Sequence, residues 1–149
     1  MMHLTFTTAF NAVHRLWSPA LSEAENRDTY AECANPSGHG HQYGLEVTVA
    51  APVGGGRPCV ISREAVRRLK EEVLRPKLHH ANLDTAFGID GFISTGENVA
   101  RAIWHFIQPE IKEEATLVSV RVIETHKNSF TYRGGTERSP GRGAPTTAV

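Results

Sequence analysis

The sequence lacks the features that would mark a secreted, membrane-spanning or nucleic-acid-binding protein. Its 149 residues include only two cysteines, which is too few for a disulfide framework. No apolar run approaches the roughly 18 residues of a membrane helix, and residues 1–14 lack the basic segment and apolar run of a secretion signal. Lysine plus arginine number 16, as do aspartate plus glutamate, so no basic excess is available to hold a nucleic-acid backbone. We therefore expect a cytoplasmic protein that binds neither nucleic acid nor membrane.

The chain length fits a single domain followed by a short tail. With 40% hydrophobic and 21% charged residues, the chain can bury a small core. Residues 135–149 are rich in glycine, proline, threonine and serine and show no apolar period. Such a segment buries too little apolar surface to offset the entropy lost on ordering. We predict a domain over residues 1–134 and a flexible tail over residues 135–149.

The hydrophobic pattern changes from alternation to helical stripes and back again along the domain. The first predicted helix is capped by Ser62, and the second begins at Ser94–Glu97, which matches a capping box. The predicted strands cover residues 4–14, 41–53, 117–123 and 128–133, and the predicted helices cover residues 62–78 and 94–107. This order indicates an α+β domain, with a four-stranded antiparallel sheet covered on one face by two helices. Because so small a sheet leaves two open edges, we also expect copies of the chain to pair into a homo-oligomer.

Three of the eight histidines form a candidate metal site. His39 and His41 are two residues apart at the start of a strand, so their side chains project from the same face. His14 ends the first strand on the parity of Phe10 and Ala12, and it can join the pair if the two strands are neighbours. Three imidazoles would leave one position of a Zn²⁺ ion open, as in catalytic zinc sites. The alternative is that His-Gly-His is a polar turn and His14 a core histidine.

Cys33 lies six residues before His39, and the turn sequence Asn35–Gly38 separates the two. A thiol folded back toward a dication would have a lowered pKa and could act as a base or nucleophile. It could also be a fourth ligand, which would close the site and favour a structural role. The remaining alternative is a small buried apolar side chain, which is how we interpret Cys59.

Two further segments carry polar side chains of interest. Glu124 ends the alternating run Val118, Val120, Val122, where a carboxylate needs a partner such as a surface cation or the N–H edge of a guanine-like ring. His79-His80 follows the first predicted helix, and at most one of two adjacent side chains can face a given site. A solvated loop is the alternative for that pair.

Several segments together resemble the 6-pyruvoyltetrahydropterin synthase family, and the match extends over nearly the whole chain up to Gly134. The segments are FNAVHRL, LSEAEN, AECANPSGHGHQYGLEVTV, LHHANLD, STGENVARAIW and IETHKNSFTYRG. The resemblance implies a tunnelling fold, in which trimers close a barrel and two trimers stack into a hexamer with active sites at subunit interfaces.

The same resemblance implies roles for individual residues. It assigns zinc binding to His14, His39 and His41, catalysis to Cys33, a relay across subunits to His80, anchoring of the pterin ring to Glu124, and the pterin pocket to Thr95 and Glu97. The implied reaction converts 7,8-dihydroneopterin triphosphate to 6-pyruvoyltetrahydropterin with loss of triphosphate, a step in tetrahydrobiopterin biosynthesis. Candidate cations for the triphosphate are Lys127, Arg133 and Arg15.

One position departs from the family pattern. His79 stands where the family relay has an aspartate directly before its histidine, so the relay includes His79 but no negative charge at that point. Asp84 or Asp90 could substitute for it. Two alternatives to the pyruvoyl-forming enzyme stay open: a 6-carboxytetrahydropterin synthase of deazapurine (queuosine) biosynthesis, and a pterin-binding protein without catalysis. The five residues between Cys33 and His39 favour the pyruvoyl-forming enzyme.

Overall fold

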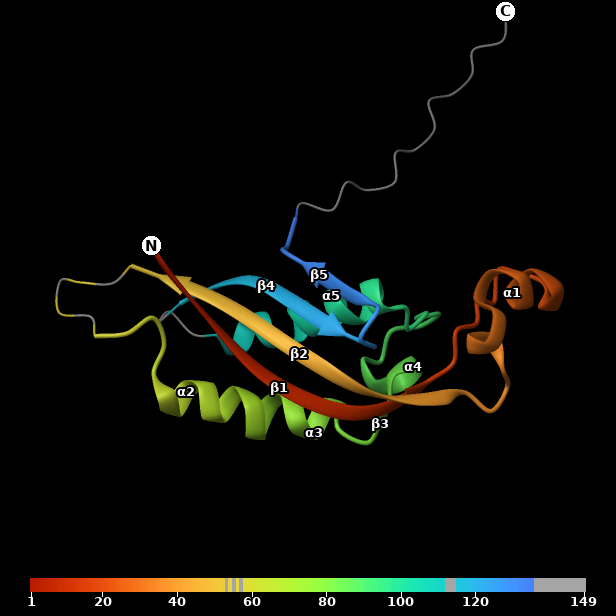
Figure 1. Cartoon of the computed structure of the whole chain (residues 1–149), viewed down its shortest axis with the longest axis horizontal. Helices are drawn as coiled ribbons and strands as arrows, with labels where there is room; N and C mark the ends of the chain where they lie inside the picture. Colours follow the sequence, from red (N-terminus) through yellow and green to blue (C-terminus); the bar gives the residue numbers. More distant parts are fainter. Residues whose placement is uncertain (53, 55, 57, 112–114, 136–149) are drawn as a thin grey trace, which may run out of the picture.

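A computed structural model describes residues 1–52, 54, 56, 58–111 and 115–135. A long, curved sheet forms the frame of the domain, and helices pack against one of its faces (Figure 1). The core joins alternate strand residues, including Phe6, Val47 and Val120, with Leu69 and Ile103 of the helices. This confirms the predicted α+β layering. The predicted tail lies, apart from Gly135, outside the described residues.

The sheet has five strands in the order β3-β1-β2-β4-β5. They are β1 (Met2–His14), β2 (His39–Ala51), β3 (Ala81–Asn82), β4 (Thr116–Ile123) and β5 (Ser129–Tyr132). β1, β2, β4 and β5 pair antiparallel, so the sheet is a mixed one of five strands rather than the predicted antiparallel sheet of four. The prediction missed β3, which pairs parallel to β1 at Ala12 and Val13. A bridge of two residues has no hydrophobic period, so the sequence pattern gives no sign of it.

A register shift between β2 and β4 changes which residue of β4 faces the core. It occurs at Thr48 and Val49 and turns Leu117 inward where strict alternation predicts Val118. Beyond the shift, Val120 and Val122 are fully buried, as predicted. Such bulges add one residue to one strand and cannot be located from alternation alone.

The first predicted helix is a continuous helical rod that starts at the predicted cap. The hydroxyl of Ser62 accepts a hydrogen bond from the Ala65 N–H at 3.1 Å. The rod comprises α2 (Arg63–Arg68), a π-helical segment (Leu69–Leu74) and α3 (Arg75–Leu78). Pro76 lies two residues after the π-helical segment, in the first turn of α3, and since proline cannot donate to the preceding turn, a local change of helical winding there is expected.

The second predicted helix is α5 (Gly96–Ile107), and its cap is one residue later than predicted. The Thr95 side chain, rather than that of Ser94, accepts from the backbone of the first turn, at Asn98 N–H. The predicted capping box at Ser94–Glu97 is therefore wrong. Ser94 is left free to bond elsewhere, and its partners lie at the candidate site described below.

The sequence pattern did not indicate α1 (Glu23–Tyr30), because Asn26 is its only buried residue. A capping box of Ser22 and Glu25 starts this helix. The Asn26 side chain accepts from the Ser18 N–H and donates to the carbonyls of Ser18, Leu21 and Ser22. The remaining short helices are α4 (Leu83–Ala86) and two 3₁₀ turns, Ala31–Ala34 and Gln108–Glu110. Among the described residues, no helix is long and apolar enough to cross a membrane.

Substituting Gly96 tests the packing of α5 on β5. A Cβ atom there would overlap the Phe130 ring. Replacing glycine by alanine within a helix ordinarily stabilises by about 1 kcal/mol, whereas overpacking costs about 1–3 kcal/mol. We expect Gly96→Ala to lower the thermal unfolding midpoint by several degrees in a melting experiment. Gly135→Ala, where a Cβ meets nothing within 4 Å, is the control; an unchanged or higher midpoint for Gly96→Ala would contradict this packing.

Candidate metal centre and active site

Three histidine side chains meet at the end of the β1–β2 ladder. The strands pair so that His14 lies opposite His39, while His41 lies opposite Ala12. All three side chains project from the face that packs against the helices. One ring nitrogen of each lies within 4.8 Å of the others, and the Nε2 atoms of His14 and His39 are 3.0 Å apart. The prediction that the two strands are neighbours and place these imidazoles together is confirmed.

A glycine makes this approach of the two strand ends possible. Gly38, the residue before β2, has φ +64°, a left-handed conformation that side chains other than glycine rarely adopt. A Cβ atom there would lie 2.9 Å from the His14 carbonyl oxygen. The Gly38 N–H donates to the Asn35 carbonyl at 2.9 Å, which closes the predicted turn. The turn thus brings His39 back beside His14.

The surroundings of His14 fix which of its nitrogens carries a proton. His14 is 2% exposed, and its Nδ1 lies 3.0 Å from the Ser94 carbonyl oxygen. A carbonyl oxygen only accepts, so Nδ1 carries the hydrogen, and in the neutral imidazole Nε2 then has the lone pair. Burial, followed by the neighbouring imidazoles, lowers the pKa of His39, and burial lowers that of His41. Neutral imidazoles are the form that binds metals.

The residues around the cluster fit a bound divalent metal. Three neutral nitrogen ligands suit Zn²⁺, and tetrahedral zinc with three protein ligands has room for one more. The Glu124 carboxylate, 16% exposed, lies 3.7 Å from His14 Nε2 and 3.8 Å from His41 Nε2. Among the described residues, the buried hydroxyl of Tyr43 has no hydrogen-bond partner, and burial, then the charges of Glu124, Asp84 and Cys33, raises its pKa. A buried hydroxyl without a partner beside these groups is typical of a ligand site.

Cys33 lies in the 3₁₀ turn Ala31–Ala34, half-buried. Its carbonyl accepts from the Leu16 N–H at 2.8 Å. Burial, together with the carboxylates of Glu124 and Glu32, raises the pKa of its thiol. The thiol therefore keeps its proton at neutral pH unless a positive charge lies nearby. Within the described part of the chain, the convergent metal-binding group comprises the three histidines and not Cys33.

His79 and His80 directly precede β3, at the edge of the sheet. Their rings stack, with centroids 3.9 Å apart and planes at 28°. His79 Nδ1 accepts from the Asn11 N–H at 3.3 Å, and the His80 N–H donates to the Asn11 carbonyl at 2.6 Å. His80, with φ +61°, is exposed. Stacked rings do not exchange the in-plane hydrogen bond that a preceding carboxylate could make to an imidazole. Burial lowers the pKa of His79, and the neighbouring His80 and Arg75 lower it further.

Comparisons with known proteins identify the family of this chain. Residues 3–135 match the family model described as 6-pyruvoyl tetrahydropterin synthase. The chain belongs to this family. The prediction of family membership is therefore confirmed.

Named relatives of this synthase family span most of the chain. The 6-pyruvoyl tetrahydrobiopterin synthase of Drosophila melanogaster is 39% identical over 134 residues, covering 88% of this chain and 79% of that protein. The human protein of the same name is 37% identical over 128 residues, covering 85% and 87%. The solved 6-pyruvoyl tetrahydropterin synthase of Caenorhabditis elegans is 32% identical with a TM-score of 0.81, covering 90% and 96%. The fold of this chain is thus that of the synthase family.

Neither candidate substitute for the relay aspartate lies beside His80 as its partner. The Asp84 carboxylate accepts hydrogen bonds from the Arg15 N–H at 3.0 Å and from the Ser94 hydroxyl at 2.5 Å. Both partners lie next to His14 rather than His80. Asp90 is exposed and lines a separate cavity. The described residues thus offer His80 no carboxylate hydrogen bond in place of the family aspartate.

The remaining predicted residues form no hydrogen bond with the cluster in the described part of the chain. Thr95 caps α5, and Glu97 is exposed in its first turn. Of the predicted triphosphate cations, Arg15 stacks over Trp17 at 4.1 Å and donates to the Ala34 carbonyl, while Lys127 and Arg133 are exposed. Within the described residues, neither Thr95 nor Glu97 hydrogen-bonds a histidine of the cluster.

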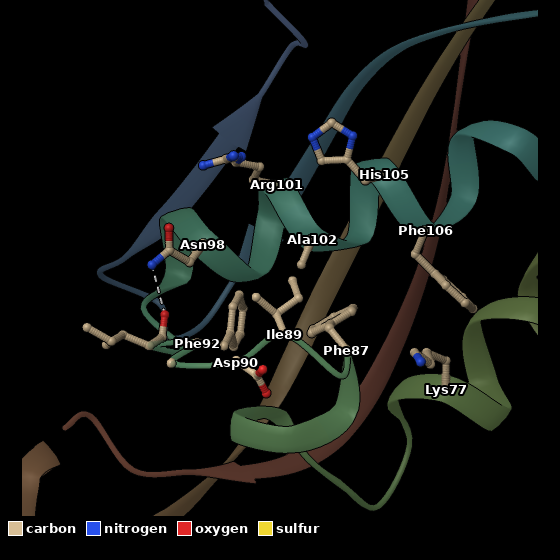
Figure 2. Close-up of a pocket in the computed structure, with 12 residues that line it drawn as sticks. Lys77, Phe87, Ile89, Asp90, Phe92, Asn98, Arg101, Ala102, His105 and Phe106 are labelled. Carbon is tan, nitrogen blue, oxygen red and sulfur yellow. Dashed lines mark hydrogen bonds between the residues drawn. The ribbon is translucent and has the colours of Figure 1, made fainter. Parts of the chain in front are cut away.

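One cavity lies away from the histidine cluster. It has a volume of about 490 Å³ and lies between α5 and the segment Phe87–Ile93, with Lys77 at its edge (Figure 2). Asp90 lines it, but none of the residues predicted to bind metal, to act in catalysis or to bind the pterin does. Conversely, sequence reasoning missed Ser94 and Tyr43 as site residues, because their patterns also fit a helix cap and a core position.

Proposed function

We propose that this chain is a zinc-dependent lyase that converts 7,8-dihydroneopterin triphosphate to 6-pyruvoyltetrahydropterin with loss of triphosphate. The observation that carries the proposal is the convergence of three metal-binding nitrogens with the Glu124 carboxylate in one partly buried site. Family membership and relatives named 6-pyruvoyl tetrahydrobiopterin synthase support a carbon–oxygen lyase of this type. The product would enter tetrahydrobiopterin biosynthesis.

His14, His39 and His41 would hold the Zn²⁺ ion. When bound, the metal supplies Lewis acidity, which makes the O–H and neighbouring C–H groups of the substrate side chain more acidic. Glu124 would accept hydrogen bonds from the N–H and NH₂ edge of the pterin, because a carboxylate matches that edge with two acceptors. Thr95 and Glu97, at the start of α5, would contribute to the same pocket.

Cys33 would move protons on one side of the substrate and His80 on the other. The Cys33 thiol removes a carbon-bound proton once its own proton has left, and the His80 imidazole passes protons on. Elimination of triphosphate requires neither water nor a redox cofactor. Each of the two residues would therefore supply one proton-transfer step.

The placement of His80 supports an active site shared between copies. His80 is exposed and borders a groove of about 450 Å³, which is lined by Asn11, Val13 and Gln42 of the sheet face away from the helices and also by His41 of the cluster. Within the described residues of one chain, no hydrogen bond links His80 with Cys33. We therefore propose that His80 serves the site of a neighbouring copy in a homohexamer of two trimers whose sheets close a barrel. The composition favours a cytoplasmic location for this assembly.

The product formed from 7,8-dihydroneopterin triphosphate tests the proposed reaction. The purified, zinc-loaded protein is incubated with this compound, and the products are identified by mass spectrometry. We expect 6-pyruvoyltetrahydropterin and free triphosphate. Release of acetaldehyde with 6-carboxytetrahydropterin would instead assign the chain to deazapurine biosynthesis. Unchanged substrate that stays bound would identify a pterin-binding protein, an alternative favoured by the stacked His79 in place of a carboxylate.

Restoring the family aspartate tests the relay. In His79→Asp, a carboxylate next to His80 can stabilise the protonated imidazole, which a stacked neutral ring cannot do. We expect kcat to rise about tenfold or more, within the ~10²–10⁴ range of acid–base groups, as measured by the rate of triphosphate release. His3→Asp, an exposed position in the first part of β1, is the matched control. No gain in a slow parent enzyme would count against the relay explanation.

A further inference from the structure

We propose that Asp84, acting through the Ser94 hydroxyl, fixes the proton and the orientation of His14 and thereby sets the affinity of the three-histidine site for a divalent metal. Of the proposed function, this inference requires one part, namely that the three histidines bind a metal. It assigns positioning roles to two residues, one at the start of α4 and one just before α5, that do not themselves contact the metal.

The directions of three hydrogen bonds follow from the chemistry of their atoms. Asp84 Oδ1 lies 2.5 Å from Ser94 Oγ, and since a carboxylate only accepts, the serine hydroxyl donates its single proton to Asp84. Ser94 Oγ therefore offers only a lone pair to His14 Nδ1, which lies 3.3 Å away. The Ser94 carbonyl oxygen, 3.0 Å from the same Nδ1, also accepts. Both atoms of Ser94 require a hydrogen on His14 Nδ1, so in the neutral ring the lone pair is on Nε2, which faces the cluster.

Burial makes this chain of bonds difficult to replace with water. Ser94 is 1% exposed and His14 is 2% exposed. Hydrogen bonds to an ionised carboxylate are stronger than neutral ones, and a surrounding of low polarity strengthens them further. A carboxylate behind a ligating imidazole raises the basicity of that ligand and holds its ring in place. Here a serine hydroxyl connects the carboxylate to the imidazole.

Asp84 also holds the backbone that carries His14. Its carboxylate accepts the Arg15 N–H at 3.0 and 3.3 Å with its two oxygens. Asp84 is itself fixed at the start of α4, where its N–H donates to the Asn82 side chain at 3.0 Å. One carboxylate therefore restrains both the end of β1 and the ring of its last residue. This is why Ser94, although next to a helix start, does not cap α5.

Zinc affinity of the full chain tests the inference. Metal-free protein competes with a chromophoric chelator for Zn²⁺, with Asp84→Asn and Ser94→Ala as variants. We expect Asp84→Asn to weaken zinc binding by about 10–100-fold and Ser94→Ala to weaken it in the same direction. Asp90→Asn makes the same chemical change at an exposed carboxylate outside the network, and we expect it to bind like the parent.

Two further measurements separate positioning from a merely structural role. The melting midpoint of the metal-free proteins reports the fold, and the visible absorption of Co²⁺ bound in place of zinc reports the ligand arrangement. We expect the Co²⁺ spectrum of Asp84→Asn to change while Asp90→Asn keeps that of the parent. Ser94→Ala leaves the bond between Asp84 and the Arg15 backbone available, so it decides the matter if Asp84→Asn yields no folded protein.

The outcomes distinguish this inference from the proposed function. Parent-like zinc affinity and Co²⁺ spectra in both variants would overturn the role of Asp84 and Ser94 while leaving the metal site intact. The role would likewise be overturned if Asp84→Asn lost zinc affinity together with a lowered melting midpoint while Ser94→Ala bound zinc like the parent. Failure of the parent protein itself to bind zinc would overturn the proposed metal site, and with it this inference.

Discussion

Replacing Cys33 with alanine is expected to lower kcat by about 10²–10⁴-fold, the contribution typical of an acid–base group, while zinc content stays unchanged. The reason is the position of the thiol: it lies near Glu124 and is half-buried, but it is not part of the convergent histidine group. Its loss removes the group that takes the carbon-bound proton and leaves the metal ligands untouched. Triphosphate release under saturating substrate measures the effect, and elemental analysis measures the zinc.

The second cysteine provides a matched control for this experiment. Cys59 is exposed rather than buried, which corrects the interpretation of it as a small core residue. We expect Cys59→Ala to keep the parent rate. Turnover at the parent rate in Cys33→Ala would show that the proposed role of the thiol is wrong. Loss of zinc in that variant would show instead that Cys33 is a ligand.

Replacing His39 with alanine is expected to reduce bound zinc from about one ion per chain to nearly none and to abolish turnover. His39 supplies one of the three ligand nitrogens of the cluster found among the described residues, and its Nε2 lies 3.0 Å from that of His14. Two imidazoles bind zinc far more weakly than three, because each lost ligand leaves another position to water. Elemental analysis after dialysis gives the occupancy, and triphosphate release gives the activity.

The control for this variant is a histidine outside the cluster. His105 is exposed on α5, so His105→Ala is expected to retain both zinc and activity. Metal-free parent protein is the second reference, since it should match His39→Ala in activity but recover when zinc is added. Full zinc occupancy in His39→Ala, or recovery of its turnover on adding zinc, would be inconsistent with a three-histidine centre.

Strand periodicity explains why the histidine cluster could be predicted from the sequence. Side chains two residues apart on a strand share a face, so His39 and His41 had to project together. His14 shares the inward parity of its own strand, and antiparallel pairing of β1 with β2 places it opposite His39. The position of Glu124 was also predictable, because Val120 and Val122 keep their alternation beyond the register shift.

Other parts of the site depend on contacts that no local pattern encodes. Ser94-Thr95 offers two equivalent capping hydroxyls, and only the tertiary bond from Ser94 to Asp84 decides which one caps α5. The two-residue strand β3 forms because the chain after His80 returns to the edge of β1. Stacking of His79 on His80 likewise follows from the left-handed backbone of His80, which sequence alone does not specify.

X-ray absorption at the zinc edge, recorded on zinc-loaded protein without substrate, tests most directly whether the three histidines form an open centre. The account predicts a first shell of nitrogen and oxygen at about 2.0–2.1 Å and no sulfur, because the described cluster contains only His14, His39 and His41. A zinc–sulfur shell at about 2.3 Å would place Cys33 on the metal. The site would then be closed and structural, which would contradict the proposed lyase.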